Sequence, residues 1–127
     1  MSALTEPLRW VQVAEEDYAL ALSALRRKRP LTYGACFHAQ QCAEKYPKAA
    51  LVARAQTFPK VHDLVALHDL CGQVGLILGI SVDDLDILSS YAVQIRYPGE
   101  PPTQEEARQA VHICRSVRRL IRGFLGL

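Results

Sequence analysis

The sequence lacks paired cysteines, long apolar runs and a strong excess of either charge. None of its four cysteines forms a CxxC pair; they are Cys36, Cys42, Cys71 and Cys114. A zinc site requires tighter spacing, and a disulfide-stabilised scaffold would be smaller and richer in cysteine. We therefore expect free, mostly buried thiols in a reducing compartment, with no bound metal and no cofactor.

The chain also lacks the signals that direct a protein to or across a membrane. No apolar run approaches the roughly 20 residues that a membrane helix needs. The N-terminal stretch MSALTEPLRW has no basic segment followed by an apolar one, so we expect no signal peptide. These absences favour a cytoplasmic protein with no membrane partner. The length of 127 residues fits one domain, 1–127, with the composition of an ordinary globular protein.

The net charge of +2 is too small by itself to imply nucleic-acid binding, but the basic residues are unevenly distributed. One cluster is the run Arg26-Arg27-Lys28-Arg29. A second cluster, near the C-terminus, consists of Arg108, Arg115, Arg118, Arg119 and Arg122. All of the second cluster except Arg118 share one face of a helix. The default interpretation of that face is a solvated surface, and the alternative is a stripe that faces RNA or a protein partner.

The chain shows no persistent strand alternation and no internal repeat. Apolar residues instead recur at spacings of three and four, which predicts amphipathic helices. The expected helices cover residues 6–28, 32–55, 63–74, 81–95 and a last segment that follows Thr103. Short connections between long helices favour antiparallel neighbours. The predicted fold is therefore all-α: an up-and-down antiparallel four-helix bundle with one additional short helix, at residues 63–74.

Two of these helices begin with capping signals. Thr103 followed by Glu106 is a complete S/T-x-x-E capping box, in which two side chains bond to backbone amides that the helix leaves unpaired. Ser81 followed by Asp84 resembles the same motif with a shorter acid. We expect a helix to start directly after each serine or threonine.

The string HAQQCAEKYPKAA, residues 38–50, places polar side chains inside the second predicted helix. Gln41, Glu44, Lys45 and Lys48 fall three or four residues apart, so they share a face that we expect to be solvated. On this face Glu44 and Lys48 are four residues apart, so we expect them to form an ion pair. Pro47 is harder to accommodate, because a proline inside a helix removes a hydrogen bond and costs about 3 kcal/mol. We expect a kink at this proline.

Three ordered pieces of the sequence resemble the HEPN domain family. The pattern AxxxxQQxxEKxxKAxL in the second helix is carried by Ala35, Gln40, Gln41, Glu44, Lys45, Lys48, Ala49 and Leu51. The junction FPKxHDL covers residues 58–64, and Arg96-Tyr97-Pro98 follows the fourth helix. The opening helix, with Trp10 and an acidic run before Tyr18, is also similar. The resemblance covers the whole chain and implies a helical domain associated with nucleotides and nucleotidyltransferases.

The resemblance implies a groove between the second and fourth helices, often at a dimer interface, that binds nucleotide or RNA. Lysines and Arg96 would neutralise phosphate, glutamines would hydrogen-bond the ligand or a partner, and tyrosines would offer flat faces to a base. The implied ligand- or partner-binding residues are Gln40, Gln41, Glu44, Lys45, Lys48, His62, Tyr91, Arg96 and Tyr97. For Arg96 the alternative is an ion pair with a carboxylate such as Asp86.

The same resemblance implies partners. Stand-alone HEPN proteins are often one half of a two-component, toxin–antitoxin-like system, whose other half is a minimal nucleotidyltransferase. We therefore expect a homodimer or higher homo-oligomer, formed through small-residue helix faces, that meets such a transferase and a nucleotide or RNA.

Some HEPN proteins are metal-independent ribonucleases that carry an arginine followed four to six residues later by a histidine. The histidine can move a proton from the ribose hydroxyl, and the arginine can stabilise the phosphorane charge. This spacing is absent here, because residues 101–103 follow Arg96 without a histidine and His62 lies out of register with Arg54. We expect no catalytic residue. The alternative function is a ribonuclease with a non-standard site that uses His38 or His62.

The remaining expectations concern single positions. We expect His62 to cap or pack at the start of the third helix, and His38 to be a core histidine beside Cys42 rather than half of a metal site. Val61 stands where the family usually has a threonine cap, which predicts a weaker start for that helix by roughly 1 kcal/mol unless another cap substitutes.

Overall fold

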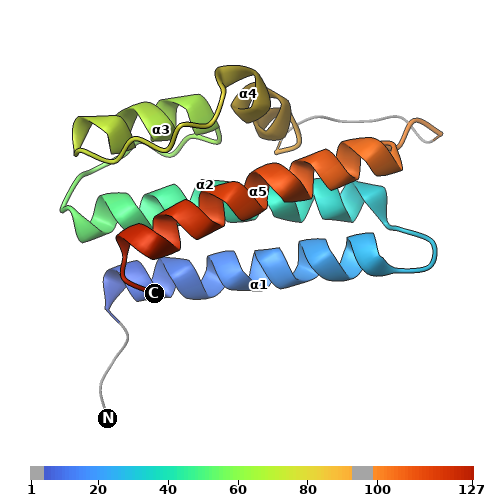
Figure 1. The fold of residues 1–127 in the computed structure, drawn as a ribbon, viewed down its shortest axis with the longest axis horizontal. Coiled ribbons are helices and arrows are strands. Elements are labelled where there is room, and N and C mark those ends of the chain that lie inside the picture. Colours follow the sequence, from blue (N-terminus) through green and yellow to red (C-terminus); the bar gives the residue numbers. More distant parts are fainter. Residues whose placement is uncertain (1–4, 93–98) are drawn as a thin grey trace, which may run out of the picture.

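A computed structural model describes residues 5–92 and 99–127 of the chain. The described residues form five helices and no strand (Figure 1). The helices are α1 (Glu6–Arg26), α2 (Thr32–Ala53), α3 (Leu64–Gln73), α4 (Val82–Ser90) and α5 (Gln104–Phe124). None of these helices combines the length and the apolar character needed to cross a bilayer.

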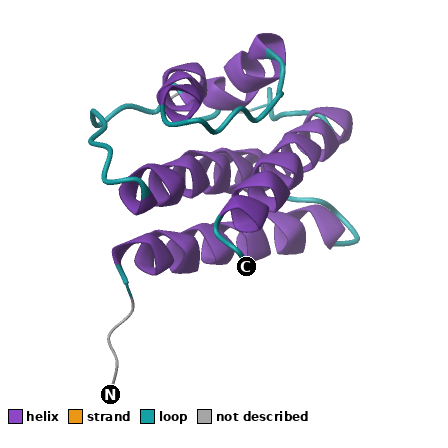
Figure 2. Ribbon diagram, turned by 60° about the vertical axis from the view of Figure 1, so that its left-hand side comes forward, coloured by secondary structure: helices purple, strands orange, loops and turns teal. Residues whose placement is uncertain are grey.

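Helix α2 is the centre of the arrangement, because it packs against each of the other four helices. Helices α1 and α2 run antiparallel and are joined by a short turn, and α5 lies along both of them (Figure 1). The two short helices α3 and α4 cover the side of α2 that lies away from α1 (Figure 2). The all-helical class is confirmed. The finer prediction of a four-helix up-and-down bundle is consistent with these contacts and stays a prediction.

Small side chains let α2 approach its neighbours closely. The alanines of α2 that are fully buried are Ala35, Ala39, Ala43, Ala49 and Ala50. All four cysteines are free and buried among these helices, as the sequence predicts. The small-residue face of α2 is therefore covered within one chain, by α1 and α5.

Helix α2 continues through Pro47 from Thr32 to Ala53 without a break. The ring of Pro47 is fully buried, and its carbonyl accepts a hydrogen bond from Sγ of Cys71 in α3 at 3.9 Å. Proline cannot donate to the carbonyl of Ala43, four residues earlier, so the helix loses one internal bond here. The surrounding core, rather than local propensity, keeps this segment helical.

The capping signals at Ser81 and Thr103 are confirmed. The hydroxyl of Ser81 accepts from the amide of Asp84 at 3.1 Å, and Thr103 and Glu106 form both bonds of a capping box. Several predicted boundaries are wrong. Helix α1 ends at Arg26 rather than residue 28, α2 at Ala53 rather than residue 55, and α3 at Gln73 rather than residue 74. Helix α3 begins at Leu64 rather than residue 63, and α4 ends at Ser90 rather than near residue 95, since residues 91–92 form a turn.

The start of α3 is capped by a residue that the sequence analysis placed inside the helix. The carboxylate of Asp63 accepts from the amides of Val65 at 2.9 Å and Ala66 at 3.3 Å. Aspartate is among the most effective N-caps, so the valine at position 61 does not leave α3 without a cap. The cap of α3 is therefore Asp63 and not His62.

Candidate functional site

The polar string of α2 divides between two sides of the helix rather than forming one solvated face. One set of side chains meets the loop before α3, and we call Gln40, Glu44, Lys48 and His62 the Glu44 cluster. A second set meets α1, and we call Asp17, His38 and Lys45 the Asp17 cluster. Glu44 and Lys48 are only 4% and 8% exposed, so the prediction of a solvated face is wrong for them. The physical reason is that α2 has neighbours on every side.

The carboxylate of Glu44 is the hub of the Glu44 cluster. Its Oε1 lies 2.6 Å from Nδ1 of His62 and accepts from Nε2 of Gln40 at 3.2 Å, while Oε2 accepts from Nζ of Lys48 at 3.1 Å. Gln41 extends the network by donating to Oε1 of Gln40 at 2.7 Å. The expected Glu44–Lys48 pair on one helix is therefore present, but in the interior. A buried charge pair is costly to break, because the remaining partner stays desolvated.

Aromatic rings cover the cationic end of the Glu44 cluster. The ammonium group of Lys48 lies 5.6 Å from the ring centre of Trp10 in α1 and 5.7 Å from that of Phe58 in the loop before α3. The two rings contact each other edge to face, with centres 6.0 Å apart. Lys48 is thus held by one carboxylate and two ring faces, and its side chain is 10% exposed. It is not placed to neutralise a phosphate in solvent.

The hydrogen bonds around Glu44 keep it ionised. Burial alone would raise the pKa of the Glu44 carboxyl, because it disfavours the charged form. The bonds from His62, Gln40 and Lys48 outweigh that effect, so the pKa of Glu44 lies below its ordinary value. Glu44 is therefore a fixed negative charge at neutral pH, positioned against one nitrogen of an imidazole.

His62 is the only member of the Glu44 cluster that is largely open to solvent. Its side chain is 58% exposed, against 5% for that of Glu44. The residue borders a hollow of about 330 Å³ that is also lined by Asp63, Asp86, Ser89 and Ser90. When Nδ1 carries the proton that faces Glu44, Nε2 of a neutral His62 is an acceptor. In this geometry Nε2 of His62 can accept a hydrogen bond or a proton from a ligand.

The Asp17 cluster fastens α2 to α1. Asp17 is 7% exposed, and its two carboxylate oxygens accept from Nδ1 of His38 at 2.9 Å and from Nζ of Lys45 at 2.5 Å. The charge of Lys45 is therefore already compensated within the chain. His38 bonds to an acid instead of acting as a core histidine beside Cys42, so that expectation is wrong.

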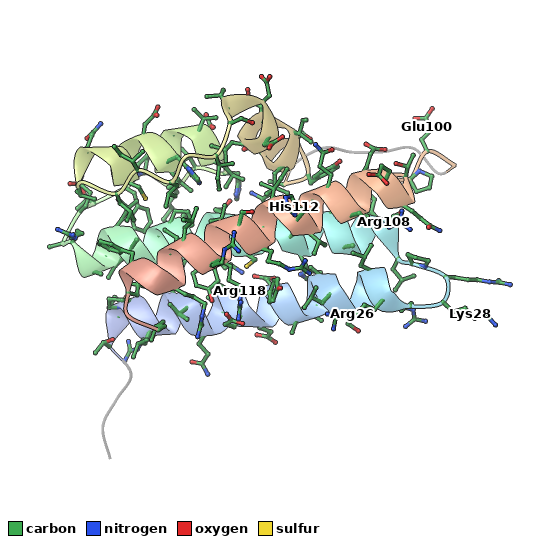
Figure 3. All side chains as sticks on the ribbon, viewed as in Figure 1. Arg26, Lys28, Glu100, Arg108, His112 and Arg118 are labelled. Carbon is green, nitrogen blue, oxygen red and sulfur yellow. The ribbon has the colours of Figure 1, made fainter. Side chains whose placement is uncertain are left out.

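A third cluster, around Glu15, joins α1, α2 and α5. The Glu15 carboxylate accepts from Nε of Arg118 at 2.7 Å, from Arg122 at 3.1 Å and from the hydroxyl of Tyr46. Burial raises the pKa of Glu15, and the bonds from Arg118 and Tyr46 outweigh it, so that the pKa falls below its ordinary value. The pKa of Tyr46 is raised by burial and by its bond to Glu15. Arg118 lies between α5 and α1 in Figure 3.

This third cluster was not predicted from the sequence. Glu15 was visible only as part of an acidic run, and Arg118 lay apart from the arginine face, yet these two residues form the shortest ion pair between α1 and α5 among the described residues. The guanidinium of Arg118 also lies over the ring of Tyr18, 4.5 Å from its centre. The available signal was the position of Arg118 itself, because a charge off the solvated face of a helix needs a partner. Within the C-terminal arginine cluster, Arg118 and Arg122 therefore have a structural role, because they hold α5 against α1 through Glu15.

The remaining implied site residues are placed as follows. Tyr91 is 9% exposed and its hydroxyl lies 3.4 Å from Oε2 of Glu106, so its ring is part of the core rather than a face open to a base. Arg96 and Tyr97 lie outside the described residues, and so do the predicted groove edge and the alternative pair between Arg96 and Asp86. Within residues 5–92 and 99–127, no group of three or more metal-binding side chains is present.

Comparisons with known proteins agree with the helical architecture. A family model described as HEPN domain matches residues 8–124. The crystal structure of TT1696 from Thermus thermophilus superposes with a TM-score of 0.72 at 23% sequence identity. That match covers 94% of this chain and 98% of the other. At this identity the structural match shows a shared fold. No curated protein matches the chain.

Proposed function

Because the chain belongs to the HEPN domain family, we propose that it is a nucleotide- or RNA-binding module in a two-component system. Its partner in this proposal is a minimal nucleotidyltransferase, and the pair is toxin–antitoxin-like. The module is a single HEPN-like helical domain, an up-and-down four-helix bundle with one additional short helix. Family membership supports a function related to nucleotides or RNA, and the partnership is the finer part of the proposal.

The observation that carries the proposal is the contrast between His62 and the residues that hold it. A side chain that is 58% exposed is fixed by a carboxylate that is 5% exposed, at 2.6 Å. A buried ion pair such as Glu44–Lys48 adds little net stability compared with apolar residues of the same size. Its effect in this chain is to fix the orientation of His62 beside the hollow. Preorganised polar groups of this kind lower the cost of ligand binding.

The proposed roles of the implied site residues therefore differ. His62 and Gln41 would contact the ligand directly, together with Arg96 and Tyr97, which lie outside the described residues. Gln40, Glu44 and Lys48 would act as supports that hold His62, and Lys45 would hold α2 against α1. Ser90, which is exposed, and the half-buried Ser89 also line the hollow. Each hydroxyl makes one bond to a backbone group and keeps capacity for a further bond to a ribose or a base.

Self-association is also part of the proposal, in the form of a homodimer or higher homo-oligomer. Since the small residues of α2 are buried within one chain, another surface must form the contact. Val13 and Leu20 are two turns apart on α1 and are 39% and 45% exposed, so this face of α1 offers two apolar side chains, with the exposed Glu16 between them, for such a contact. Light scattering of purified protein tests the oligomeric state, and a monomer at all concentrations would contradict this part.

The test of ligand binding compares two histidine variants. His62→Ala removes the exposed imidazole of the Glu44 cluster, while His112→Ala removes an exposed imidazole on α5 that makes no side-chain bond to a described residue. Titration calorimetry with nucleoside triphosphates and a short RNA should show weaker binding by the first variant only. Equal loss in both, or no binding by the wild type, would contradict the nucleotide- and RNA-binding proposal.

The nucleotidyltransferase partner is tested separately. Co-purification of the tagged chain with a minimal nucleotidyltransferase encoded beside it should yield a stable complex. If the two proteins elute separately at micromolar concentration, the partnership proposal is wrong while ligand binding at His62 can still hold.

The Glu44–His62 pair favours one alternative function, a metal-independent ribonuclease with a non-standard site. A histidine oriented by a carboxylate is a suitable general base for the ribose 2′-hydroxyl. This alternative predicts RNA cleavage that persists in EDTA and is lost in His62→Ala and in Arg96→Ala. Cleavage retained in both variants, or no cleavage by the wild type, would remove it.

A further inference from the structure

The turn between α1 and α2 carries the most concentrated positive charge of the described chain. We call Arg26, Arg27, Lys28 and Arg29 the basic tip. All four are exposed, and none makes an ion pair or hydrogen bond through its side chain to a described residue. The tip is at one end of the molecule, where Figure 3 places Lys28 beside the turn and Arg26 on the last turn of α1. The cluster is therefore an uncompensated positive patch with no structural role among the described side chains.

The sequence around the basic tip contains no acid. No aspartate or glutamate occurs in residues 18–43, and the acids on either side, Asp17 and Glu44, are bound in buried clusters. The acidic first turn of α5 is at the same end of the molecule (Figure 1). Its Glu105 pairs with Arg108, and Glu106 completes the cap of α5. Glu100 and Glu105 are also exposed at this end of the molecule, but among the described residues neither forms an ion pair with the tip. The basic tip itself thus carries four cations and no acid, a concentration of charge that attracts a polyanion.

The backbone holds the basic tip in a defined shape. Helix α1 ends where Arg27 adopts an extended conformation, and the amide of Leu31 donates to the carbonyl of Ala24 at 2.9 Å, closing the turn. Arg27, Lys28 and Arg29 line a hollow of about 410 Å³. Three cations arranged around one concave space can contact successive phosphates of a strand, and arginine does so with paired hydrogen bonds.

Side chains next to the basic tip fit a single strand better than a rigid duplex. Tyr33 and Leu31 follow the cations and are each 52% exposed. An exposed aromatic ring beside a basic patch provides a surface on which an unpaired base can stack. Because binding to phosphates and stacking are independent of base identity, the expected recognition has little sequence preference.

We propose that the basic tip is a docking site for the phosphate backbone of single-stranded RNA. It lies at the α1–α2 turn and is separate from the Glu44 cluster, which meets the loop before α3. The proposal does not rest on the function assigned to His62. A strand could be captured at the tip whether or not a ligand binds beside His62.

The test measures RNA affinity as a function of salt. In the tip variant, Arg27, Lys28 and Arg29 are replaced by glutamine. The control variant carries Arg9→Gln, Arg54→Gln and Arg119→Gln, which remove the same charge from exposed positions away from the turn. Fluorescence anisotropy with a labelled oligouridylate gives the binding constant at several salt concentrations. Circular dichroism and thermal melting verify that both variants remain folded.

The expected result follows from counterion release. Each neutralised phosphate of a single strand contributes about 0.7 to the slope of log K against log salt concentration, so three contacts contribute about 2. The tip variant should lose that slope and bind about 100-fold more weakly at ~0.1 M salt. The control variant should keep nearly the wild-type slope.

Several outcomes would overturn the proposal. These are the absence of RNA binding by the wild type at low salt, equal losses in the two variants, and a tip variant that binds like the wild type. Vesicles containing phosphatidylserine and an acidic peptide serve as competing probes. If binding of the vesicles or of the peptide is lost in the tip variant while RNA binding is unchanged, the tip binds another kind of partner and the RNA proposal is wrong. Binding to RNA with His62→Ala unchanged and the tip variant impaired would support the tip and contradict the His62 proposal.

Discussion

Replacing Glu44 by glutamine tests the energetic role of the Glu44 cluster. The change keeps the shape and removes the charge, which leaves the ammonium group of Lys48 buried with two aromatic rings as its remaining partners. Removing one partner of a buried pair costs about 3–5 kcal/mol. The glutamine oxygen can still accept one hydrogen bond and the rings still attract the cation, so we expect a loss of about 3 kcal/mol, at the lower end of that range.

Urea denaturation of the wild type and Glu44→Gln measures this loss directly. In a thermal melt, a chain of this length should lose about 4 °C in melting temperature for each kcal/mol of stability lost, so Glu44→Gln should melt about 12 °C below the wild type. The matched control is Glu105→Gln, because Glu105 is paired with Arg108 at 3.4 Å but its side chain is 84% exposed. An exposed pair contributes at most about 1 kcal/mol. Equal losses in the two variants would refute the claim that Glu44 is a buried hub.

The double variant Glu44→Gln, Lys48→Met separates the lost charge from the lost packing. Methionine fills the space of the lysine stem without a charge, so the unpaired ammonium disappears. We expect the double variant to recover at least half of the stability lost in Glu44→Gln. If the two changes are instead additive, the coupling between Glu44 and Lys48 inferred from their 3.1 Å bond is wrong.

Three other predictions concern pH, a buried hydroxyl and a helix cap. The pKa of Glu44 is lower in the folded than in the unfolded chain, so the ionised carboxylate stabilises the fold at neutral pH. This contribution is lost as the pH falls through the folded-state pKa. The difference in unfolding free energy between the wild type and Glu44→Gln should therefore become smaller in acid. Tyr46→Phe should lower the unfolding free energy by about 1.5–3 kcal/mol in urea denaturation, since it deletes a hydrogen bond to a charged group, and an unchanged unfolding free energy would contradict it. Asp63→Ala should cost about 1 kcal/mol in urea denaturation through loss of the α3 cap, whereas Asp63→Asn should cost little.

Local signals in the sequence predicted local structure well. The capping box at Thr103 and Glu106 depends on residues three positions apart, and both of its hydrogen bonds are present. The end of α4 was harder to predict, because apolar periodicity continues past Ser90 while the chain turns there. The neighbouring helices decide whether an apolar residue continues a helix or packs at a turn. A periodic pattern within one segment does not contain that information.

The contacts of the candidate site were even harder to predict from the sequence, because they depend on how the helices pack. The spacing of Glu44 and Lys48 correctly indicated a pair on one helix face, but it could not indicate that α1 and the loop before α3 cover that face. The pairing of Glu44 with His62 joins residues far apart in the sequence, so no local pattern predicted it. The family resemblance selected both residues without showing their contact. Asp63, by contrast, could have been recognised as a cap from its position just before an apolar run.

Ligand binding at His62 can be tested by observing the His62 ring while ligand is added. Two-dimensional nitrogen–proton spectra of the histidine side chains, recorded during titration with RNA or a nucleoside triphosphate, report each imidazole separately. We expect the His62 ring signals to shift and to saturate as ligand is added while those of His112 stay in place, and we expect Glu44→Gln to weaken the apparent affinity. Signals of His62 that do not move while ligand binds elsewhere would contradict binding at this histidine.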